Sequence, residues 1–101
     1  MASNKNTIDR EMYAYTALLR QLSAKYNTSE LKTLIKELDD LNSEISQDNH
    51  LEYNEEEVDK LRLIVINLQI QIIHCDYADL KPVCLYLSEL LDDIRSNLQL
   101  V

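Results

Sequence analysis

Glycine is absent from the 101-residue chain, and Pro82 is its only proline. Glycine supplies the positive backbone angles that tight β-hairpins, strand bulges and phosphate-binding loops require, so nearly every route to these structures is closed. Neither a Gly-rich dinucleotide-binding motif nor a P-loop can be present. Low-complexity tracts and Pro, Gly or Ser-rich linkers are missing too, which argues against a second domain. These absences favour an all-α fold with a single domain over residues 1–101.

Segments that could target or anchor the chain are also missing. Residues 1–7 are polar and no apolar run follows them, so nothing resembles a signal peptide. The longest apolar stretch, residues 63–73, contains three polar amides and is too short to span a bilayer. Two cysteines are too few for a secreted disulfide scaffold. We therefore expect a soluble, cytoplasmic protein without a membrane span, in which residues 1–6 are disordered.

Four segments show the periodicity of amphipathic helices, and their predicted ranges are 8–26, 28–47, 55–76 and 80–98. Three of the predicted helices begin after residues with capping chemistry, namely Thr7, the pair Asn27 and Glu30, and the pair Asn54 and Glu57. The single proline is tolerated in the first turn of the fourth helix. Four helices of similar length joined by short connections predict an antiparallel four-helix bundle.

The third segment is apolar on most of its circumference. Its first stripe comprises Val58, Leu61, Val65, Leu68, Ile72 and Cys75, and its second comprises Leu63, Ile66, Ile70, Ile73 and Tyr77. Such a helix must be covered on all sides. Residues 67–72 also alternate between polar and apolar, as in a β-strand. A lone strand would have no partner and no turn residues to form a hairpin, so we predict a helix.

Acidic residues are concentrated between Glu37 and Asp59, where ten carboxylates occur without any Lys or Arg. We call residues 37–59 the acidic belt; the rest of the chain is near neutral, so the formal net charge of -8 originates in this segment. The dipole of the third helix favours the acids of its first turn, residues 55–57. Asp40, Glu44 and Asp48 lie one turn apart instead, and each like-charge pair costs roughly 0.2–0.5 kcal/mol. This part of the belt either binds a partner or serves only as a solvated face.

The residues predicted to contact a partner are Asp39, Asp40, Glu44, Asp48, Glu52 and Tyr53. Tyr53 is included because the chain has six Tyr and no Phe or Trp, so some rings should reach the surface, and because Tyr is common in interaction hot spots. The partner would present a basic surface, as a toxin or a nucleic-acid-binding protein does, and the belt could act as a DNA mimic. Direct nucleic-acid binding is not expected because the chain has no basic patch. Calcium is disfavoured because no Gly-turned acidic loop exists.

Catalytic and metal-binding residues are sparse. Cys75, Cys84 and His74 are close in sequence, but their spacing matches no zinc pattern. Both cysteines fall on apolar stripes, so we favour core packing over a disulfide or a metal site. Neither His50 nor His74 has a nucleophile or carboxylate at a spacing that specifies a triad. We predict no enzymatic activity, no metal and no cofactor.

The sequence thus predicts a non-catalytic protein-binding module that inhibits or neutralises its partner through the acidic belt. In size, helical layout and charge, the chain resembles the small four-helix bacteriocin immunity proteins and the compact acidic inhibitors carried by phages and mobile elements. The alternative is a self-assembling structural or regulatory module, a homodimer formed through the third or fourth helix. Two faces are candidates for this dimer: Leu63, Ile66, Ile70 and Ile73, or Val83, Tyr86 and Leu90.

Overall fold

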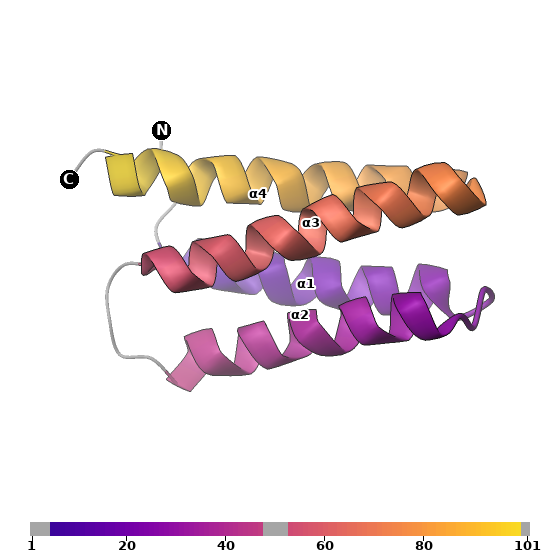
Figure 1. The fold of residues 1–101 in the computed structure, drawn as a ribbon. Coiled ribbons are helices and arrows are strands. Elements are labelled where there is room, and N and C mark those ends of the chain that lie inside the picture. Colours follow the sequence, from indigo (N-terminus) through magenta and orange to yellow (C-terminus); the bar gives the residue numbers. More distant parts are fainter. Residues whose placement is uncertain (1–4, 48–52, 100–101) are drawn as a thin grey trace.

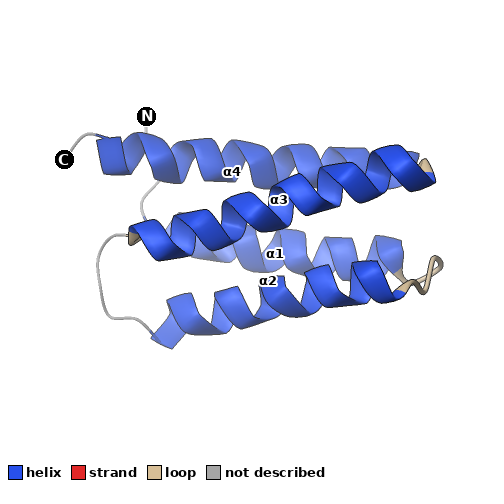
Figure 2. Cartoon of the chain, in the orientation of Figure 1, coloured by secondary structure: helices blue, strands red, loops and turns tan. Residues whose placement is uncertain are grey.

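The computed structural model describes residues 5–47 and 53–99 of the chain as an antiparallel four-helix bundle (Figure 1). Its elements are α1 (Lys5–Ser23), α2 (Ser29–Gln47), α3 (Glu55–Cys75), the short 3₁₀ helix η1 (Ala78–Leu80) and α4 (Lys81–Gln99). Each α-helix contacts the two α-helices beside it, in the cyclic order α1, α2, α3, α4. No strand occurs in the two described ranges (Figure 2). The predicted fold class is confirmed.

The core consists of aliphatic side chains from all four α-helices. One leucine from each, Leu19, Leu38, Leu68 and Leu87, is 0% exposed. Within the described residues, every buried side-chain nitrogen or oxygen has a hydrogen-bond partner. The amide of Asn42 on α2, for example, donates to the hydroxyl of Thr16 on α1 over 2.8 Å. Apolar burial therefore holds the bundle together without leaving unsatisfied polar groups inside it.

The first two helices begin at positions that differ from the prediction. α1 starts at Lys5, so Thr7 lies inside the helix and does not cap it, and residues 5 and 6 are helical where disorder was expected. The rest of the segment 1–6 lies outside the described residues. α2 is capped by Thr28, whose hydroxyl accepts from the backbone N–H of Leu31 over 3.3 Å. Asn27 instead adopts a positive φ of 48° in the turn, a conformation that Asn tolerates well.

The start of α3 is the predicted capping box. The Asn54 side chain accepts from the backbone N–H of Glu57 over 2.8 Å, and the Glu57 side chain accepts from the backbone N–H of Asn54 over 3.0 Å. At the other end, Asp76 takes a left-handed conformation, and the N–H of Tyr77 donates to the carbonyl of Ile72. Without glycine, the chain ends α3 with Asp, which also tolerates this conformation.

One end of the bundle is held together by side chains from the α1–α2 turn and from η1. Lys25 forms an ion pair with Asp79 over 2.7 Å, and the Tyr26 hydroxyl donates to the same carboxylate. The Tyr26 ring lies against that of Tyr77, with centroids 4.1 Å apart. The hydrogen bond from Lys25, followed by that from Tyr26, lowers the pKa of Asp79 below its ordinary value of 3.8.

Replacing Asp79 with Asn should therefore change the acid dependence of stability. A carboxyl group with a lowered pKa in the folded state stabilises that state above its unfolded pKa, and this contribution is lost as pH falls through the folded pKa. We expect D79N to be less stable than the wild type at pH 7, with the difference shrinking as pH falls below 3.8. Urea unfolding at several pH values measures this difference in the free energy of unfolding. Asp76→Asn, in the same connection but outside the Lys25–Asp79 ion pair, is the matched control for the same side-chain change at pH 7.

Candidate functional site

The most unusual surface feature is a row of aliphatic side chains along the outside of α3. Leu63, Ile66, Ile70 and Ile73 form this row, which we call the α3 ridge, and they are between 39% and 78% exposed. Their spacing of three or four residues places them on one side of the helix, over a length of about 15 Å. Scattered exposed aliphatics are ordinary, but an aligned row of four is typical of a binding surface.

The ridge is exposed because α3 packs only against its two neighbours in the bundle. Its first apolar stripe faces the core, and Leu61, Val65 and Leu68 are buried there. α2 and α4 cover the flanks of α3, so the side opposite the core has no helix over it (Figure 1). The expectation that α3 is covered on all sides is therefore wrong within the described chain. The four exposed residues are those predicted as one of the two dimer faces.

Two grooves lie between the ridge and α2, and carboxylates line both. Leu63 lines a groove of about 310 Å³ together with Glu37, Asp40 and Glu44. Ile70 lines a second groove of about 300 Å³, which Glu37 also borders. We call Glu37, Asp40 and Glu44 the acidic edge. Leu63 and Ile70 of the ridge thus border the acidic edge, which gives a face that is apolar along α3 and negative along α2.

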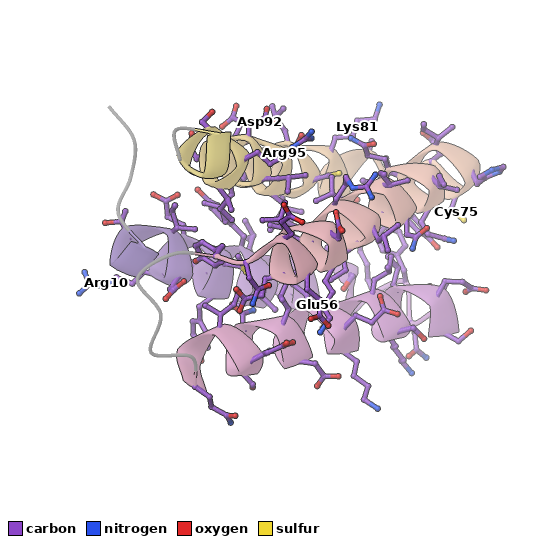
Figure 3. All side chains as sticks on the ribbon, turned by 60° about the vertical axis from the view of Figure 1, so that its left-hand side comes forward. Arg10, Glu56, Cys75, Lys81, Asp92 and Arg95 are labelled. Atoms are coloured by element: carbon purple, nitrogen blue, oxygen red, sulfur yellow. The ribbon has the colours of Figure 1, made fainter. Side chains whose placement is uncertain are left out.

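Ion pairs neutralise only part of this negative charge. Glu44 accepts from Lys60 over 2.9 Å, and this hydrogen bond is the main reason that the pKa of Lys60 is raised. The same lysine lies 3.7 Å from Glu56, near the start of α3 (Figure 3). Glu37 and Asp40 are exposed and have no ion-pair partner within residues 5–47 and 53–99. Two carboxylates beside the ridge therefore remain available for a cationic partner.

The structure separates the acids that were predicted to act together. Asp40 and Glu44 lie on the acidic edge, but Asp39 points toward α1, where it pairs with Arg20. Asp39 is therefore on the other side of α2 and does not border the ridge. Asp48 and Glu52 lie outside the described residues. Glu37 belongs to the acidic belt but is not among the predicted contacts. Its position one turn before Asp40 and Leu41 is the sequence feature that could have identified it.

Tyr53 does not lie on the surface as predicted. Its side chain is only 5% exposed, and its hydroxyl donates to Asp9 on α1. Burial first, and then this hydrogen bond, raise the pKa of Tyr53 far above its usual value. Tyr53 therefore connects the start of α3 to α1, and a buried ring cannot be the exposed hot spot that the sequence suggested. The exposed tyrosines include Tyr13 and Tyr86.

The second predicted dimer face, on α4, does not exist as a surface. Val83 is 0% exposed and Leu90 is 1% exposed, because both point into the core. Tyr86 is partly exposed, and its ring stacks on that of Tyr15 from α1 at a centroid distance of 5.3 Å. Two of the three residues are thus unable to contact another molecule, which leaves the α3 ridge as the exposed member of the two predicted faces.

The two cysteines lie in different environments. Cys84 is buried, as predicted, and burial raises the pKa of its thiol. Cys75 is exposed at the end of α3, with its thiol 3.9 Å from the side-chain oxygen of Gln71, so the prediction that it packs in the core is wrong (Figure 3). Both are free thiols. Among the described residues, no group of three or more His, Cys, Asp or Glu is arranged to hold a metal ion, and no helix has the length and apolar character to cross a membrane.

Comparison of the chain with protein-family models, with curated proteins and with solved structures finds no match. The functional argument therefore depends on the face formed by the α3 ridge and the acidic edge.

Proposed function

We propose that this protein is a non-catalytic protein-binding module whose partner presents a basic amphipathic helix. The observation that carries the proposal is the adjacency of the exposed α3 ridge and the carboxylates of the acidic edge. An amphipathic helix would place its apolar stripe on the ridge and its Lys or Arg residues beside Glu37 and Asp40. A partner covered in this way loses its own basic surface, so binding inhibits or neutralises it.

Charge favours such a partner over a second copy of the chain. In a two-fold dimer with antiparallel α3 helices, the acidic edge of one copy lies beside the acidic edge of the other. Glu37 and Asp40 of both copies would then repel each other as they lose water. A basic helix removes this repulsion and pairs both carboxylates. Nucleic acid is disfavoured for the same reason, because its phosphates would meet the acidic edge.

The probe for this proposal is a synthetic peptide of about 20 residues, long enough to form a stable helix on binding. It carries leucines spaced to form one stripe and lysines on both sides of the stripe. We expect saturable binding by isothermal titration calorimetry, weakened as salt is raised. A peptide with Glu in place of every Lys should not bind. Failure of the lysine peptide to bind, or equal binding of the two peptides, would overturn the proposal.

Two variants separate the parts of the face. Ile66→Gln with Ile70→Gln removes apolar contact, and Glu37→Lys with Asp40→Lys reverses charge. Each pair should weaken binding at least about tenfold, equivalent to about 1.4 kcal/mol. Asp92→Lys with Asp93→Lys makes the same charge change on exposed positions of α4 and should leave affinity within about twofold. Circular dichroism confirms that each variant is helical, and unchanged binding of either test pair would contradict the proposal.

Light scattering distinguishes the self-assembly alternative. The wild type should remain monomeric as its concentration is raised, with the peptide forming a one-to-one complex. A dimer that dissociates in the Ile66→Gln, Ile70→Gln variant would instead assign the ridge to a second copy of the chain.

A further inference from the structure

A third groove, between α1 and α2, differs from the proposed face in both charge and position. It measures about 450 Å³, within the range of small-molecule sites. The ion pair between Arg20 and Asp39 lines one end, and Asn27 and Thr28 line the other. These limits lie about 16 Å apart along α2. The α1–α2 groove is thus of limited length along the two helices.

The lining of the α1–α2 groove is mostly apolar. Leu31 is buried, Ile35 is half-buried, and Ala24 is exposed on the α1 side. The small side chain at position 24 leaves room that a larger residue would fill. An aliphatic chain placed between Ala24 and Ile35 would lose contact with water without displacing any ion pair.

Two cations lie on the same groove. Lys32 and Lys36 are one turn apart on α2, and both line it. Both are exposed, and neither has an ion-pair partner within the described ranges. Like charges at this spacing repel by roughly 0.2–0.5 kcal/mol. The start of α2 adds further positive potential at the Thr28 end. In a protein of net charge -8, this is a local site for an anion.

We propose that the α1–α2 groove binds a single-chain anionic amphiphile, a small molecule with an aliphatic tail and a carboxylate or phosphate head. The tail lies against Ala24, Leu31 and Ile35, and Lys32 and Lys36 bind the head. The limited length and small volume of the groove favour a free amphiphile over a membrane surface. The groove lies between α1 and α2, whereas the acidic edge borders α3, so this site is distinct from the face proposed for the protein partner.

The test is an NMR titration of the full chain with sodium octanoate and with octyl phosphate, both kept below micelle-forming concentrations. We expect saturable shifts of backbone amides in residues 20–39 with at least one of the two heads. The neutral 1-octanol should bind at least tenfold more weakly, because it lacks the charge that Lys32 and Lys36 recognise. Shifts centred on the α3 ridge, absence of saturation, or binding only to vesicles of anionic phospholipid would overturn the assignment.

Two variants test the groove itself. Lys32→Gln with Lys36→Gln should weaken binding at least tenfold while leaving the apolar lining intact. Ala24→Trp should weaken it to a similar extent by filling the groove while both lysines remain. Lys81→Gln with Arg95→Gln removes the same charge from α4 and should leave affinity within twofold (Figure 3). Unchanged affinity in either groove variant contradicts the proposal, and helicity by circular dichroism shows that each variant is folded.

Discussion

Replacing Leu68 with Ala is expected to lower the free energy of unfolding by about 3 kcal/mol, within the usual range of 2–5 kcal/mol for a buried leucine. Leu68 is 0% exposed and lies on the core side of α3. The loss combines the transfer of its side chain from water with the cavity that remains. For a domain of this size, the melting temperature should fall by roughly 12–24 °C. Thermal and urea unfolding followed by circular dichroism would measure both quantities.

Ile73 on the same helix provides the matched control. It is 78% exposed, so Ile73→Ala should change the free energy of unfolding by less than about 0.5 kcal/mol. Alanine also has the higher helix propensity, which offsets the small loss of contact. Comparable destabilisation by the two variants would show that the α3 ridge is covered in solution, and would contradict the exposed face on which the proposed function depends.

The helices could be predicted from the sequence, but the orientation of α3 could not. Leu61 and Leu68 lie on one stripe, and Ile66 and Ile73 on the other, and both stripes have similar apolar content. Periodicity alone gives no preference between them. The choice depends on how α2 and α4 cover the flanks of α3, which is a property of the whole bundle. The prediction could therefore name the ridge residues but not establish that they are exposed.

The predicted start of a helix agrees with the structure where the capping hydrogen bonds could be identified from the sequence. Asn54 and Glu57 form the predicted capping box because both members can satisfy each other's backbone N–H groups. Asn27 was predicted to cap α2 in a similar way, but Thr28 caps this helix and Asn27 adopts the positive φ of the preceding turn. Adjacent polar residues compete for such roles, and in a chain without glycine the same Asn is suited to both.

The acidic belt shows why acidic residues that are close in sequence cannot be assumed to lie on the same face of the protein. Asp39 and Asp40 are neighbours in the chain, yet Asp39 pairs with Arg20 of α1 and Asp40 lines a groove with α3. Successive residues on a helix point about 100° apart, so they reach different neighbours. Glu44 accepts a hydrogen bond from Lys60, which lies 16 residues further along the chain and is the first residue after the belt. Composition located the negative charge, but only the fold shows which carboxylates remain unpaired.

Replacing Tyr53 with Ala should destabilise the protein by about 3 kcal/mol, comparable with the loss of other large core side chains. The ring is 5% exposed, and its hydroxyl donates to Asp9, so it connects the start of α3 to α1. Tyr53→Phe keeps the ring and should cost only about 0.5–1.5 kcal/mol, the usual contribution of one hydrogen bond. Tyr13→Ala is the control, because Tyr13 is 71% exposed and should change stability by less than about 0.5 kcal/mol.

Alkaline unfolding provides an independent check on the buried hydroxyl. Because burial and Asp9 raise the pKa of Tyr53 in the folded state, its hydroxyl stabilises the fold below the ordinary value of 10.0, and this contribution is lost as pH rises above that value. The wild type should therefore lose stability more steeply than Tyr53→Phe above pH 10. Parallel pH profiles for the two proteins, or equal destabilisation by Tyr53→Ala and Tyr13→Ala, would place the Tyr53 ring on the surface and restore it as a candidate partner contact.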